Sequence, residues 1–139
     1  MEEEASIMAN NGKIKVSAFR NVRNTKPVND YFIDDILNGI KEGRWQEKVE
    51  CLRSLNDKKA YDEAKTSFPC MTVAGTFSTR NNNALLMYSA LLCLDIDNVE
   101  NPEEIKERIK IEPFVYSIFT SLSGRGLAVI VRIDPDRDK

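Results

Sequence analysis

The stretch of sequence that decides the fold runs from residue 86 to residue 97 and reads LMYSALLCLDID. Its residues Leu86 to Ile96 are almost entirely apolar, which predicts a central strand that is covered on both faces. Asp95 and Asp97 stand at the end of this strand. Because residues i and i+2 of a strand point to the same face, we expect both carboxylates to project together while Ile96 packs on the other face.

Strands and helices are predicted on both sides of this stretch, from apolar periodicity and from Gly, Pro and Asn breaks. Before it, a strand is predicted over residues 13–19, helices over 31–41, 44–55 and 58–66, and a strand over 70–77. After it, a helix is predicted over residues 102–110 and strands over 114–120 and 127–133. This order predicts an α+β fold with a mixed, mainly antiparallel sheet and flanking helices.

The composition excludes several classes of protein. A chain of 139 residues fits one domain, and we expect a flexible segment over residues 1–12 and a single domain over residues 13–139. The start Met1-Glu2-Glu3-Glu4 is acidic, unlike a secretory signal, and the apolar run of residues 84–94 is too short to cross a bilayer. The chain has 3 scattered cysteines, which suit a reducing compartment. We therefore expect a cytoplasmic protein, and the short apolar run adds that it has no membrane partner.

The sequence contains no histidine, so its chemistry must run on carboxylates, hydroxyls and cations. Two like charges on one face, such as Asp95 and Asp97, repel each other. A divalent cation that prefers oxygen ligands, Mg2+ or Mn2+, is the usual way to offset that repulsion. Asp95 and Asp97 are therefore predicted to be metal ligands and catalytic residues. The alternative is a solvated turn in which the acids end the strand without binding a ligand.

The segment Ser121-Leu122-Ser123-Gly124-Arg125-Gly126 is the second candidate. Its hydroxyls, its glycines and its arginine are typical of a loop that binds phosphate. We therefore predict an anion or phosphate site formed by Ser121, Ser123, Gly124, Arg125 and Gly126. The alternative is an ordinary connection between two strands, with Arg125 in solvent.

A basic segment near the start is the third candidate. The net charge of the chain is -2, but residues 10–29 contain five cations and no acid. Such a segment can follow the phosphates of a nucleic acid. Arg20, Arg23, Lys26 and the more distant Arg80 are the predicted nucleic-acid contacts. A solvated strand and loop, balanced by the acids on either side, is an equal alternative.

Several short motifs, taken together, resemble a known family. They are Val16-Ser17-Ala18-Phe19, Ile40-Lys41-Glu42-Gly43-Arg44-Trp45, Leu52-Arg53, Lys65 with Pro69, Gly75-Thr76-Phe77, Leu94-Asp95-Ile96-Asp97-Asn98 and the Ser121 segment through Leu127. In this order they resemble the VirE N-terminal domain of mobile-element primase and helicase proteins, and through it the archaeo-eukaryotic primase superfamily. The resemblance implies a primase-type, RRM-like core whose acids hold metal and whose Ser-Gly turn binds the phosphates of a nucleoside triphosphate.

The leading hypothesis is therefore a primase- or polymerase-like domain, a metal-dependent nucleotidyltransferase if active, that makes primers on a DNA or RNA template during replication of a mobile genetic element. Ala128 stands about where that superfamily commonly has a histidine, and a third carboxylate has no source but the tail acids Asp134, Asp136 and Asp138. We therefore expect either a fragment of a longer protein or an incomplete, inactive site. The rival hypothesis is a non-catalytic module that binds nucleic acid or a helicase domain or subunit. A structural domain whose acids cap a helix is the third.

Overall fold

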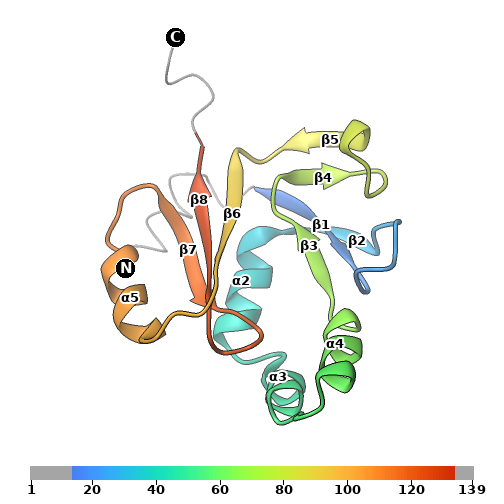
Figure 1. Ribbon diagram of the computed structural model, residues 1–139. Coiled ribbons are helices and arrows are strands. Elements are labelled where there is room, and N and C mark those ends of the chain that lie inside the picture. The colour runs from blue at the N-terminus through green and yellow to red at the C-terminus, as the bar shows by residue number, and fades with distance from the viewer. Residues whose placement is uncertain (1–13, 134–139) are drawn as a thin grey trace. The chain divides into compact units, whose positions relative to one another are not determined.

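The computed structural model describes residues 14–133, which form two compact units. Unit 1 is described over residues 90–133 and unit 2 over residues 14–89. Both units contain helices and antiparallel strands, which confirms the predicted α+β class (Figure 1). The single domain over residues 13–139 stays a prediction. The flexible segment predicted over residues 1–12 lies outside the described residues.

The central strand of the larger sheet in unit 2 is β1 (Lys15–Phe19). It pairs with β2 (Asn29–Phe32) on one side and with β3 (Cys70–Thr72) on the other. Ser17, in the middle of β1, is fully buried, and its Oγ donates to Asp30 Oδ1 at 2.6 Å and accepts the Phe77 N–H at 2.9 Å. This hydroxyl ties β1 to its neighbour β2 and to β4 (Gly75–Phe77).

The helices of unit 2 confirm the three that the sequence predicts before residue 70. They are α2 (Ile33–Lys41), α3 (Gln46–Arg53) and α4 (Lys58–Thr66). Their ends follow from local residues: Gly43, just after α2, has a φ of 82°, and the Asp57 carboxylate caps α4 by accepting the Ala60 N–H at 3.0 Å. None of the helices within residues 14–133 has the length and apolar character needed to span a membrane.

Two strands of unit 2 differ from the predictions. The sequence does not signal β2, because Asn and Asp in its first two positions are poor strand formers. The strand predicted over residues 70–77 is divided into β3 and β4 by a turn. The short helix η1 (Asn82–Ala84) connects β4 to β5 (Leu85–Tyr88), and these two strands pair in a separate sheet.

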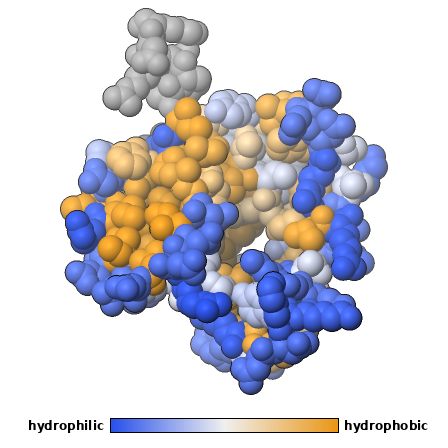
Figure 2. Space-filling view, viewed as in Figure 1, coloured by the Kyte–Doolittle hydropathy of each residue, from blue (hydrophilic) through white to orange (hydrophobic). Residues whose placement is uncertain are grey.

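Unit 1 is a three-stranded sheet with one helix. Its elements are β6 (Leu91–Ile96), α5 (Pro102–Ile109), β7 (Val115–Thr120) and β8 (Leu127–Arg132). The strand order is β6-β8-β7, and α5 connects the two outer strands. Ile105 and Ile109 of α5 pack on a core that includes Val129 of β8. In Figure 2 much of the surface of this unit is apolar.

The prediction that Leu86 to Ile96 form one central strand is wrong. The stretch breaks at Ser89 and Ala90, where Ala90 has a φ of 59°, and its halves belong to different sheets. β6 is an edge strand, and its Leu92 and Leu94 remain 46% and 45% exposed. The central strand of this sheet is β8, which pairs on both sides and is buried from Leu127 to Val131. An apolar run does not encode how many strands pair with it or which elements cover its faces.

A single mixed sheet and an RRM-like core are not confirmed. The strands of residues 14–133 form three separate sheets, and every pairing in them is antiparallel. An RRM is built on a four-stranded sheet. The sheet of unit 1 has three strands, because the other half of the apolar run of residues 86–96 pairs with β4 instead.

Candidate functional site

Asp95 lies near the end of β6, on the face of the sheet opposite α5. It stands across from Ala128 of β8, and its side chain is exposed. Ile96 packs on the α5 side against the apolar core, as strand alternation predicts. Burial raises the pKa of the Cys93 thiol, and the Asp95 carboxylate raises it further. The charge of Asp95 therefore acts along the same face as Cys93. Asp97 follows the strand and is also exposed.

Residues 121–126 connect β7 to β8 in a closed turn. The Ser121 N–H donates to the Gly126 carbonyl at 3.0 Å, and the Gly124 N–H donates to the Ser121 carbonyl at 3.0 Å. The Ser121 and Ser123 hydroxyls are 3.2 Å apart, and Ser123 Oγ also accepts the Arg125 N–H at 3.2 Å. Since these amides bind within the turn, an anion here would be held by the hydroxyls and by the exposed Arg125 guanidinium.

The backbone brings this turn directly against the acidic end of β6. A Cβ atom added to Gly126 would lie 2.5 Å from the Ile96 carbonyl oxygen, 3.1 Å from Ser121 Oγ and 3.5 Å from the Asp97 Cα. The Val99 N–H donates to the Arg125 carbonyl at 2.8 Å, which fixes the other side of the turn. The two predicted groups, acids and Ser-Gly turn, are therefore neighbours at one end of the unit 1 sheet.

This end of the sheet offers few protein ligands to a cation, so it suits a cation that takes most of its ligands from water and phosphate. Within residues 14–133, no three His, Cys, Asp or Glu side chains gather in a way that would hold a metal ion. The tail acids Asp134, Asp136 and Asp138 lie outside the described residues. Mg2+ is commonly bound by one or two carboxylates together with ligand phosphates and water. Asp95 and Asp97 beside the turn match this donor set. Their roles stay predictions.

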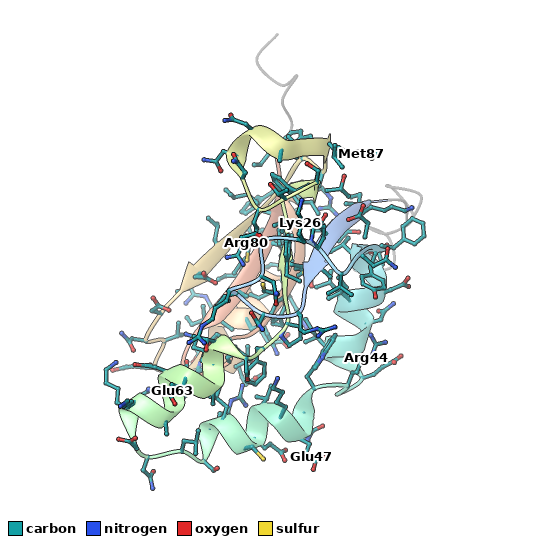
Figure 3. All side chains as sticks on the ribbon, turned by 90° about the vertical axis from the view of Figure 1, so that its right-hand side faces the viewer. Lys26, Arg44, Glu47, Glu63, Arg80 and Met87 are labelled. Carbon is teal, nitrogen blue, oxygen red and sulfur yellow. The ribbon has the colours of Figure 1, made fainter. Side chains whose placement is uncertain are left out.

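The predicted nucleic-acid residues belong to unit 2. Arg20, Arg23 and Lys26 are exposed in the loop between β1 and β2. Arg80 holds that loop in place: its Nη1 donates to the Val22 carbonyl at 2.7 Å, and its backbone N–H donates to the Thr25 carbonyl at 2.8 Å. Figure 3 shows Arg80 beside Lys26. Arg80 is thus first a positioning residue for the basic loop.

The sequence gives no signal for a depression that adjoins this loop. It is open to solvent, has a volume of about 410 Å3 and is lined by Thr72, Phe77, Arg80, Asn81 and Asn82. Asn81 and Asn82 belong to a segment predicted as a plain turn. Their position next to Arg80 and to a partly exposed aromatic ring follows from the β4–β5 pairing, which the sequence pattern does not specify.

Fold and sites together describe an α+β protein with an acidic strand end in one unit and a basic loop in the other. The family model described as BT4734-like, N-terminal domain matches residues 63–139, more than half of the chain. The chain therefore belongs to this family. No curated protein matches the chain. No solved structure matches it either.

This family corrects the resemblance drawn from the short motifs. The predicted membership of the VirE N-terminal domain family is wrong, because the family model that matches the chain describes a different family. The primase and nucleotidyltransferase roles rested on that resemblance, and they are unsupported. Several of the matching residues instead have structural roles in this fold: Ser17 ties strands together, and the Arg44 guanidinium packs over Gly39 and lies 5.2 Å from the Trp45 ring centroid.

Proposed function

We propose that this protein binds a phosphate-bearing small molecule, of the nucleoside triphosphate class, together with Mg2+ or Mn2+ at the end of the unit 1 sheet. The observation that supports this proposal is the close approach of Gly126 to the Ile96–Asp97 backbone. This approach supports the proposal because the turn carries Ser121, Ser123 and Arg125, and the strand end carries Asp95 and Asp97.

The acids of the site are proposed to bind the cation, and the Ser-Gly turn is proposed to bind the phosphate. Asp95 and Asp97 supply hard oxygen ligands for the cation, which a bound phosphate and water would complete. The Ser121 and Ser123 hydroxyls are hydrogen-bonded to each other at 3.2 Å, so at most one hydroxyl proton of the pair can donate to a phosphate oxygen. Arg125 adds a charge-assisted, planar donor whose backbone is fixed through Val99. A bound cation would reduce the repulsion between the carboxylates and the phosphate, and a bound phosphate would reduce the repulsion between the cation and Arg125.

The two functions of this site are tested by calorimetric titration with Mn2+ and with ATP, each alone and both together. Binding of ATP should be stronger with Mn2+ present. Asp95→Asn with Asp97→Asn should weaken Mn2+ binding, and Arg125→Gln should weaken ATP binding, each by roughly tenfold or more, since charge-assisted hydrogen bonds are worth about 1.5–3 kcal/mol.

The matched controls are Glu104→Gln and Arg108→Gln, which remove exposed charges of the same kinds from α5. Both should leave the two affinities unchanged. Equal affinities in the wild-type protein, the site variants and the controls would contradict the proposal.

A second candidate function is the binding of nucleic acid by the basic loop of unit 2. It is favoured by the way Arg80 fixes the loop backbone while Arg20, Arg23 and Lys26 stay exposed. Binding of this kind should weaken steeply as salt rises, and it should be independent of Mg2+ and of Asp95. A labelled oligonucleotide titrated at several salt concentrations measures both dependences; a flat salt response would contradict this function.

A further inference from the structure

The depression in unit 2 brings aromatic, amide, hydroxyl and cationic side chains together. Its lining combines an aromatic ring, Phe77, with the Asn82 amide, the Thr72 hydroxyl and the Arg80 guanidinium. Phe77 is partly exposed, and Asn82 is exposed on the turn that precedes β5. Its volume of about 410 Å3 is in the range of small-molecule sites, which is roughly 300–1,000 Å3.

Several of the polar groups around this depression have bonding capacity left. Within residues 14–133 the Asn82 amide has no hydrogen-bond partner, and Asn81 uses its Oδ1 for the Asn83 N–H, which leaves its amide NH2. The Arg80 hydrogen bonds to the Val22 and Asn24 carbonyls both come from Nη1, so its other guanidinium nitrogens stay available. An asparagine amide offers both an acceptor and donors, so it can bond to the acceptor and donor groups on the edge of a nucleobase.

The basic loop lies directly beside these groups. The Arg80 backbone is hydrogen-bonded to Thr25, the residue before Lys26, and Figure 3 shows Lys26 and Arg80 on the same side of the unit. A cationic track next to an aromatic ring is the combination with which proteins bind unpaired strands: the cations follow the phosphates, and the ring stacks on a base. In a duplex the bases are stacked on each other and their faces are not accessible to a side chain.

We infer that the depression lined by Phe77 and Asn82 binds an unpaired nucleobase, so that unit 2 prefers single-stranded nucleic acid over duplex. This inference rests on the second candidate function above and adds a base site to its phosphate contacts. Phe77 stacks on the base, the Asn82 amide meets its edge, and Arg80 and Lys26 meet the adjoining phosphates.

The full chain is titrated into labelled oligo-dT, oligo-rU and a DNA duplex of equal length, with fluorescence anisotropy as the measurement. Single strands should bind about tenfold more tightly than the duplex. Phe77→Leu, which keeps an apolar side chain but removes the ring, should weaken single-strand binding by roughly five- to hundredfold and leave duplex binding unchanged. The two single strands distinguish DNA from RNA as the source of the base.

Asn82→Ala is the second variant, because Asn82 is exposed and its substitution should not disturb the fold. It should also lower single-strand affinity selectively, while Asn83→Ala, on the same turn but outside the lining, should not. Equal binding of single strand and duplex, with both site variants like the wild type, overturns the inference but leaves the basic-loop function standing. Absence of any binding to the wild-type chain would overturn both.

Discussion

The acidic strand end of unit 1 and the basic loop of unit 2 carry opposite charges and are held in place by different means. In unit 1, backbone meets backbone: Gly126 lies against the Ile96 carbonyl, and Val99 bonds to Arg125. In unit 2, one distant residue holds the loop: Arg80, 58 residues away from Val22, binds the Val22 carbonyl through its side chain and the Thr25 carbonyl through its backbone N–H. The backbone arrangement of the first site should therefore survive substitution of its charged side chains, even where ligand binding is lost, whereas the arrangement of the second depends on a single arginine.

The largest effect is expected where unit 1 depends on its apolar centre. Leu127→Ala removes a buried β8 side chain from the core on which α5 packs, and it should lower the free energy of unfolding by about 2–5 kcal/mol. Leu92→Ala, in the edge strand β6, should cost clearly less, because that side chain is 46% exposed. Urea unfolding followed by circular dichroism measures both. Equal decreases in the free energy of unfolding for the two variants would contradict the assignment of β8 as the central strand and β6 as an edge strand.

The second effect concerns the backbone contact of unit 1. Gly126→Ala places a methyl group against the Ile96 carbonyl, and overpacking of this kind costs about 1–3 kcal/mol. Mn2+ and ATP binding should weaken together, because the turn must move away from the acids. Oligonucleotide binding by unit 2 serves as the internal control and should not change. Unaltered stability with unaltered Mn2+ affinity would show that the close approach has no part in the site.

The third effect tests the dependence of unit 2 on one side chain. Arg80→Ala removes hydrogen bonds that are each worth about 0.5–1.5 kcal/mol, and it should loosen the basic loop. Oligonucleotide affinity should fall by more than for Lys26→Gln, which removes one charge and should reduce the salt slope by roughly 1. Lys59→Gln, an exposed lysine on α4, is the charge-matched control. An Arg80 variant that behaves like Lys26→Gln would assign Arg80 a phosphate contact alone.

The smallest effect compares two thiols that lie in opposite electrostatic surroundings. Burial raises the pKa of both Cys93 and Cys70, but Asp95 raises that of Cys93 further, whereas Arg80 lowers that of Cys70. The thiolate is the reactive form. Asp95→Asn should therefore move the onset of Cys93 alkylation to lower pH, and Arg80→Ala should move that of Cys70 to higher pH. Mass spectrometry of alkylated protein over a pH series, in a Cys51→Ser background, separates the two sites. Shifts in the same direction would contradict the charge assignment.

Much of the local structure was predictable because its causes are local. Asp57 caps α4, Pro102 opens α5 and Gly43 follows α2, and each signal stands in the sequence at the place where it acts. The turn of residues 121–126 and the acids after the apolar run were also found this way. The short motifs, by contrast, led to the wrong family, because residues such as Ser17 and Arg44 are explained by packing within this fold.

The sequence by itself determined which residue types are present and the period of each segment: no histidine, two acids at the end of an apolar run, and helices with local end signals such as Asp57 before α4 and Pro102 in α5. Only the tertiary structure decided which apolar run is central, that the run of residues 86–96 divides at Ala90 between two sheets, and that Arg80 fixes a loop far away in sequence. The reason is physical. Capping and periodicity depend on neighbours along the chain, whereas the burial of a strand and the partners of a guanidinium depend on what pairs beside them in space.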